Sequence, residues 1–66
     1  QYGVRVMKEL DVVKLKTDFR SITARTEGTI VLEYDGTAFE VEFFDKDGET
    51  IDVATTPVDV IELTSE

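Results

Sequence analysis

The 66-residue sequence contains no cysteine, no histidine and no tryptophan, and it has a single proline. A chain without cysteine or histidine forms no disulfide, has no thiol nucleophile or imidazole base, and lacks the usual nitrogen and sulfur ligands of zinc. Long hydrophobic runs are missing too, because the longest apolar stretches are two or three residues. None of them has the length of a membrane-spanning helix or a signal-peptide core. We therefore expect a cytoplasmic protein that does not contact membranes.

Basic residues are scarce in the second part of the chain. Residues 27–66 contain one base, Lys46, against twelve acids, whereas residues 1–26 hold six bases against three acids. The formal net charge is −8, and proteins that bind nucleic acids usually neutralise phosphates with bases, so nucleic acid is a disfavoured partner. Two interpretations of the acidic surface stay open. It keeps a small protein soluble, or it docks a basic partner or imitates a polyanion.

Composition and length indicate one small globular domain. Hydrophobic residues make up 41% of the chain and charged residues 33%, which is unlike the composition of disordered proteins. We place a single domain at residues 7–64. Residues 1–6, which precede Met7, are interpreted as an upstream extension or a cloning remnant, although their alternating apolar residues are also compatible with an extra strand.

Apolar and polar residues alternate along most of the chain, a pattern typical of strands with one buried face. The clearest case is Phe39, Val41 and Phe43, which are separated by Glu40 and Glu42. The predicted strands span residues 11–16, 28–34, 38–44, 49–55 and 60–63.

Turn signals separate these strands. Asp35-Gly36 and the segment 45–48, which ends in Gly48, favour tight hairpins, and Pro57 favours a single 3₁₀ turn before the last strand. Five short antiparallel strands cannot cover both faces of a flat sheet, so we predict an all-β, five-stranded, SH3-like partly open barrel. Gly28 is expected at a bulge or sharp bend of this barrel. The predicted core consists of Val13, Leu15, Ile30, Leu32, Phe39, Val41, Phe43, Ile51, Val53, Ile61 and Leu63.

An eleven-residue connection, residues 17–27, joins the first two predicted strands. Loops of this length are uncommon in compact domains and are often functional. Phe19 and Ile22 are expected to fold over an open end of the sheet, or to be exposed anchors for a partner, with the basic Arg20 and Arg25 beside them.

Several segments resemble a known family. These are Leu10-Asp-Val-Val-Lys-Leu, Glu27-Gly-Thr-Ile-Val-Leu-Glu-Tyr, Phe39-Glu-Val-Glu-Phe-Phe-Asp and Asp47-Gly-Glu-Thr. Together they are similar to a family of small bacterial and cyanobacterial proteins catalogued as a domain of unknown function, over residues 7–63. The resemblance implies an SH3-like barrel with no established activity, and mobile gene neighbourhoods that include toxin-like genes.

Carboxylates are the only plentiful reactive groups. Glu40 and Glu42 lie on one predicted strand face, whereas glycosidase-type chemistry needs two carboxylates across a cleft, so we predict no catalytic residues and no enzyme. The segment 45–49 resembles a calcium loop in part, but no glutamate follows at position twelve of such a loop. We interpret it as a turn, and we predict no metal site and no cofactor.

We therefore expect a non-enzymatic protein-interaction domain, with a neutralising or accessory role for a genetically linked protein as the family resemblance suggests. Phe44 follows the alternation of Phe39, Val41 and Phe43 out of phase, so it marks either a bulge or an exposed apolar patch. Self-association through an edge strand is an additional expectation. The candidate partner-binding residues are Phe19, Arg20, Arg25, Glu40, Glu42 and Phe44.

The alternative is a nucleic-acid-related module. In this interpretation the chain either uses a weak basic strip or imitates nucleic acid and occupies a nucleic-acid-binding protein. The candidate strip consists of Lys14, Lys16, Arg20 and Arg25.

Overall fold

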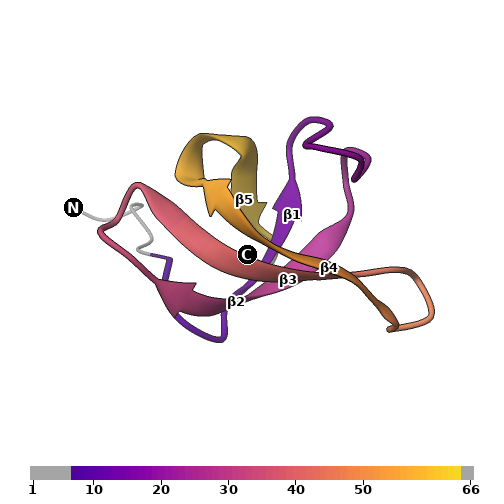
Figure 1. The fold of residues 1–66 in the computed structure, drawn as a ribbon, viewed down its shortest axis with the longest axis horizontal. Coiled ribbons are helices and arrows are strands. Elements are labelled where there is room, and N and C mark those ends of the chain that lie inside the picture. Colours follow the sequence, from indigo (N-terminus) through magenta and orange to yellow (C-terminus); the bar gives the residue numbers. More distant parts are fainter. Residues whose placement is uncertain (1–6, 65–66) are drawn as a thin grey trace.

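A computed structural model describes residues 7–64 of the chain. The strands form one antiparallel sheet with the order β4-β3-β2-β1-β5, and the sheet is curled but not closed (Figure 1). This confirms the prediction of a five-stranded, partly open all-β fold with one 3₁₀ turn before the last strand. The elements are β1 (Val12–Leu15), β2 (Glu27–Glu33), β3 (Ala38–Phe44), β4 (Thr50–Pro57), the 3₁₀ helix η1 (Val58–Val60) and β5 (Ile61–Leu63).

Residues 1–6, for which an extension, a remnant or a strand was considered, lie outside the described residues. Within the described part, no helix is long and apolar enough to cross a membrane.

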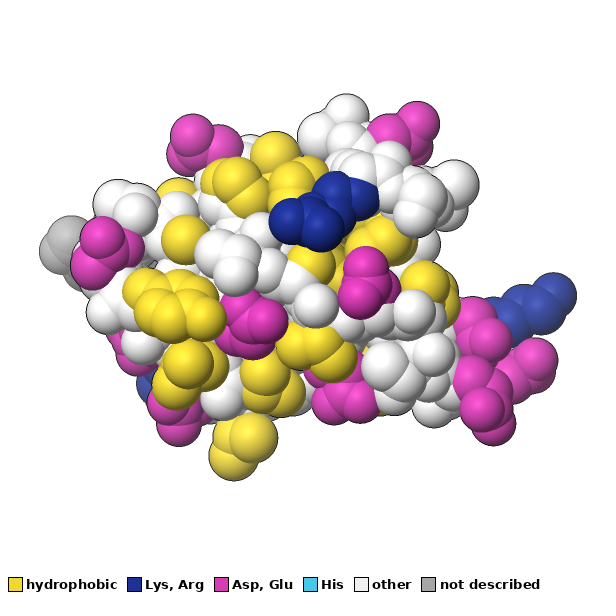
Figure 2. Space-filling view, in the orientation of Figure 1, with side chains coloured by type: hydrophobic (Ala, Val, Ile, Leu, Met, Phe, Trp, Pro, Cys, Tyr) yellow, Lys and Arg dark blue, Asp and Glu magenta, His cyan; other side chains and the backbone are white. Residues whose placement is uncertain are grey.

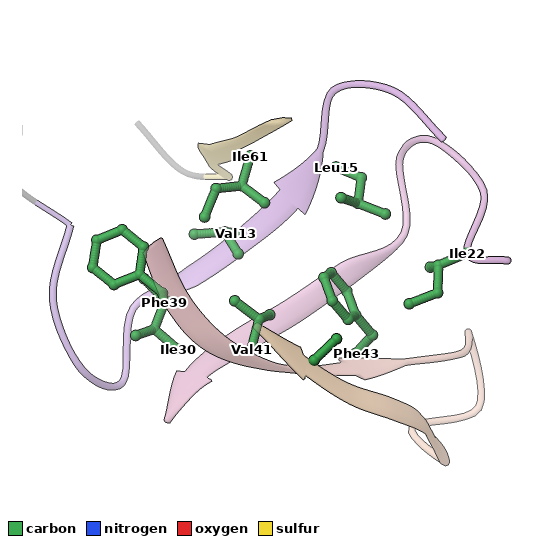
Figure 3. Close-up of a cluster of buried hydrophobic side chains, with 9 residues drawn as sticks. Val13, Leu15, Ile22, Ile30, Phe39, Val41, Phe43 and Ile61 are labelled. Atoms are coloured by element: carbon green, nitrogen blue, oxygen red, sulfur yellow. The ribbon is translucent and has the colours of Figure 1, made fainter. Parts of the chain in front are cut away.

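The hydrophobic core lies on the concave side of the sheet, where side chains from all five strands and from the β1–β2 connection meet (Figure 3). β3 supplies the centre of this core, because Phe39, Val41 and Phe43 are buried while the residues between them are half-buried. The buried hydrophobic residues are Val13, Leu15, Ile22, Ile30, Phe39, Val41, Phe43, Ala54 and Ile61.

The prediction for β4 was wrong about which side chains face the core. Ile51 and Val53 are exposed, at 48% and 46%, whereas Ala54 and Thr56 are buried. The register explains the difference, because Ala54 lies opposite Val41 and Thr56 lies opposite Phe39. These large side chains of β3 fill the interior, so small residues face them from β4. The buried Thr56 hydroxyl donates a hydrogen bond to the Ala54 carbonyl at 3.0 Å.

The register of β2 also differs from the prediction. A register shift between Ile30 and Leu32 breaks the alternation, so that Leu32 lies opposite Glu40 and is 45% exposed instead of buried. The irregularity therefore lies after Ile30 and not at Gly28. Leu63, another predicted core residue, is half-buried and packs against the core.

The β1–β2 connection covers one end of the sheet. Ile22 is only 3% exposed, and Phe19 packs against the core while partly exposed. Phe19 and Ile22 exchange two backbone hydrogen bonds of 2.9 Å, which form a small hairpin with Arg20 at a positive φ of 58°. This confirms the interpretation that these two residues fold over an open end of the sheet.

Candidate functional site

The convex, solvent-facing side of β1–β4 is called the outer face here. The paired residues form rows across the strands, and β3 contributes Glu40, Glu42 and Phe44 at every second position. Three of the candidate residues therefore lie together on the outer face of a single strand. Its other members are Val12 and Lys14 on β1, Glu27, Thr29 and Leu32 on β2, and Val53 and Thr55 on β4.

Aliphatic side chains are exposed on the outer face. Val12, Leu32 and Val53 are each 44–46% exposed, and the neighbouring Ile51 is 48% exposed. Hydrophobic side chains also lie among acidic ones over the part of the surface shown in Figure 2, where basic side chains are few. Along the rows of the sheet, these aliphatic side chains lie beside the polar side chains of Thr29, Glu40 and Glu42.

Glu40 and Glu42 are half-buried in this surface and are held by hydroxyl groups. Glu40 Oε1 accepts hydrogen bonds from the Tyr34 hydroxyl at 3.0 Å and the Thr55 hydroxyl at 2.8 Å. Glu42 Oε2 accepts one from the Thr50 hydroxyl at 2.6 Å. Among residues 7–64, neither carboxylate forms a salt bridge, and no donor bonds to Glu40 Oε2 or Glu42 Oε1.

Phe44 lies between two shallow grooves. It is half-buried, and a register shift separates its pair with Thr50 from the preceding pair of β3 and β4. The sheet is therefore irregular here, and the half-buried Phe44 side chain lies on the outer face; its role as an apolar contact for a partner stays a prediction. The larger groove, about 660 Å³, is lined by Thr23, Ala24, Arg25, Thr26, Glu27, Phe44, Asp45, Lys46 and Ile51. The smaller groove, about 440 Å³, is lined by Val12, Glu27, Thr29, Phe44, Asp45, Lys46 and Gly48.

The arginines of the connection lie in different surroundings. Arg25 adopts a positive φ of 78° and lines the larger groove beside Phe44. Arg20 lies on the hairpin, where its guanidinium carbon is 5.6 Å from the centroid of the Phe19 ring, within cation–π range. Neither Phe19 nor Arg20 lines the two grooves. The structure thus places Arg25 and Phe44 in the lining of one groove, whereas Phe19 and Arg20 lie on a separate hairpin.

Several outer-face residues were missed from the sequence. The outward position of Val12 could have been predicted, because Val12 adjoins the buried Val13 and neighbouring strand residues point to opposite sides of a sheet. The outward positions of Val53 and Leu32 could not have been predicted, because both residues fit the alternation expected of an inward face. Only the register shifts turn them outward.

The other acidic residues have local structural roles. Asp45 Oδ1 accepts backbone hydrogen bonds from Asp47 and Glu49, both at 2.9 Å, which confirms the turn interpretation of residues 45–49. In the part of the chain that the structure describes, no three acidic side chains are close enough to hold a metal ion.

Asp35 closes the β2–β3 turn. Its carboxylate accepts hydrogen bonds from the Thr37 hydroxyl at 2.7 Å and the Thr37 backbone N–H at 3.0 Å. Both bonds favour the charged form, so the pKa of Asp35 lies below its ordinary value of 3.8. The effect belongs to the turn and does not involve the outer face.

Comparison with known proteins gives one positive result. No curated protein and no solved structure matches the chain. A family model matches residues 9–63, which contain all five strands. The resemblance noted in the sequence is thereby confirmed at the level of a family without a known function. The chain belongs to the family described as Domain of unknown function (DUF4926).

Proposed function

We propose that the chain is a small non-enzymatic protein-interaction domain that contacts its partner through the outer face around Phe44. The observation that supports this most directly is the position of Phe44, between two grooves and on the same strand face as Glu40 and Glu42. Aromatic side chains at the centre of a surface, surrounded by polar groups, are frequent anchors of protein interfaces.

The arrangement of the carboxylates supports binding over catalysis. Glu40 and Glu42 lie side by side on one strand, so they do not face each other across a substrate as a hydrolytic pair does. The grooves beside Phe44 are open to solvent, which gives no enclosed site in which a carboxyl pKa would be raised.

The finer parts of the proposal depend on the family resemblance. We propose that the partner is a protein encoded nearby, that the domain neutralises or assists it, and that both act in the cytoplasm. The nucleic-acid alternative has weaker support. Lys14 lies between Glu27 and Glu62 on the neighbouring strands, with its amine 3.9 Å from a Glu62 carboxylate oxygen, so its charge is offset locally.

An affinity pull-down from a lysate of the source organism tests the proposal, with wild type, Phe44→Ser and Leu10→Ser as baits. Leu10 is 79% exposed and lines neither groove, so its variant is a matched loss of exposed apolar surface. We expect a stoichiometric partner that Leu10→Ser retains and Phe44→Ser loses.

Circular dichroism must first show that each bait is folded. Equal capture by folded Phe44→Ser and wild type would refute the role of Phe44. The absence of any partner with wild type would refute the interaction function.

A further inference from the structure

The outer face combines exposed aliphatic side chains with carboxylates that lack a cationic partner within residues 7–64. Aliphatic surface attracts apolar groups, and half-buried carboxylates attract cations. We infer that the outer face binds a segment of a partner protein that carries both aliphatic and basic side chains, and that Glu40 and Glu42 receive the basic ones. This inference deepens the proposed function and rests on it.

The two carboxylates are oriented before any partner arrives. Hydrogen bonds from Tyr34, Thr55 and Thr50 fix one oxygen of each carboxylate. The second oxygens, Glu40 Oε2 and Glu42 Oε1, keep their acceptor capacity toward groups outside the described chain. A bound Lys or Arg side chain would therefore meet an ordered acceptor, which lowers the entropy cost of binding.

The neighbours of Glu40 and Glu42 strengthen the attraction of these carboxylates for a cationic group. Glu42 lies between Thr29 and Val53 in its row, and Glu40 lies between Leu32 and Thr55. A partner that covers Leu32 and Val53 would exclude water from the carboxylates, and electrostatic attraction grows when water is excluded. Glu40 and Glu42 are two residues apart on one strand, so their Cα atoms are separated by roughly 7 Å. Apolar and basic groups of the partner must therefore alternate over a similar distance.

Charge argues against a second copy of this chain as the occupant. Each copy carries a net charge of −8, and face-to-face packing would bring the carboxylates of two outer faces together. Like-charge contacts of this kind disfavour association. The same carboxylates would attract a basic partner.

The free edge of β4 is a poor alternative docking place. The Val53 N–H is bonded to the Asp52 carboxylate at 2.8 Å, so by the alternation of an antiparallel ladder the backbone of Val53, Thr55 and Pro57 faces the edge. Pro57 has no N–H, so of these three residues only Thr55 is left, by this alternation, to offer an N–H at the edge. An added strand would find little to pair with at this edge, so the β4 edge competes poorly with the outer face.

Titration of the ¹⁵N-labelled protein with a short peptide of alternating valine and lysine tests the inference. We expect chemical-shift changes in outer-face residues of β2, β3 and β4. The double variant Glu40→Gln/Glu42→Gln should bind at least about tenfold more weakly, since charge-assisted contacts are lost. The control Asp47→Asn/Asp59→Asn, which removes the same charge from the β3–β4 turn and from η1, should bind within about twofold of wild type.

Two further peptides separate the contribution of aliphatic side chains to binding from that of basic side chains. A serine–lysine peptide should bind more weakly than the valine–lysine peptide, and a valine–glutamate peptide should not bind. Equal weakening in both double variants, or equal binding of the serine–lysine peptide, would overturn the inference by showing diffuse charge attraction. Failure of the valine–lysine peptide would also overturn it, whereas the proposed function would stand if Phe44→Ser still loses a partner in the pull-down.

Discussion

At the scale of single residues, Gly28 determines how closely β2 and β3 pack. It lies opposite Phe43 on β3 and Val13 on β1. A Cβ atom at this position would lie 2.6 Å from Val41 Cγ1 and 2.8 Å from the Glu42 carbonyl oxygen. The sequence suggested a bend at Gly28, but the structure shows that the glycine is needed because a side chain would collide with β3.

Gly28→Ala should therefore destabilise the domain by about 1–3 kcal/mol, the usual cost of forcing extra atoms into a packed core. Urea unfolding monitored by circular dichroism measures the change. Thr29→Ala, at the next position of the same strand but on the outer face, is the control and should cost less. If Gly28→Ala unfolds at the same urea concentration as wild type, the close approach at this position is refuted.

At the scale of elements, β4 is an edge strand of the sheet, and its own residues occupy part of its free backbone. Asp52 occupies the Val53 N–H with its carboxylate and places a charge on an edge strand, which is a common protection against strand-to-strand association. We expect Asp52 to limit association through the β4 edge.

Asp52→Ala should increase concentration-dependent self-association, because it frees one edge N–H and removes the charge. Sedimentation velocity across a wide range of protein concentrations gives the readout. Asp59→Ala removes the same charge from η1 and should sediment like wild type. Equal behaviour of the two variants would show that net charge, and not the edge, governs association.

The sequence predicted β3 correctly but not β4, and the reason is physical. β3 pairs on both sides and buries one face, so Phe39, Val41 and Phe43 show the alternation plainly. β4 pairs on one side only, and a register shift between the pairs of Phe43 and Phe44 decides which of its side chains face inward. The alternation of Ile51 and Val53 is indistinguishable, in sequence, from that of a buried strand face.

The candidate site, like the fold, was predictable from the sequence only in part. Glu40, Glu42 and Phe44 share a face because they share a strand and a phase, which is a local property. The groove between Arg25 and Phe44 depends on how the β1–β2 connection lies against the sheet. Arg25 takes a left-handed conformation there, which no residue pattern in the connection indicated.

At the scale of the whole molecule, residues 7–64 form one small core with nine buried hydrophobic residues. Domains of this size have a free energy of unfolding of roughly 3–10 kcal/mol. Each large side chain in the core therefore supplies a large share of the total. Phe43 is fully buried, whereas its neighbour Phe44 is half-buried on the outer face.

Phe43→Ala should cost about 3–5 kcal/mol and leave the domain largely or wholly unfolded at moderate temperature. Thermal unfolding followed by circular dichroism tests this. Phe44→Ala, the matched control, removes the same atoms from the outer face and should shift the midpoint much less. Comparable losses in the two variants would mean that Phe44 also belongs to the core.

The strand order has a consequence for synthesis. β1 is completed on one side by β5, where Val13 pairs with Leu63 and Leu15 with Ile61, and Ile61 is itself buried. A chain still emerging from a ribosome therefore holds β1 through β4 with an open core until residue 63 is outside the exit tunnel. During that interval Val13 and Leu15 lack the strand that pairs with them from β5 in the finished fold.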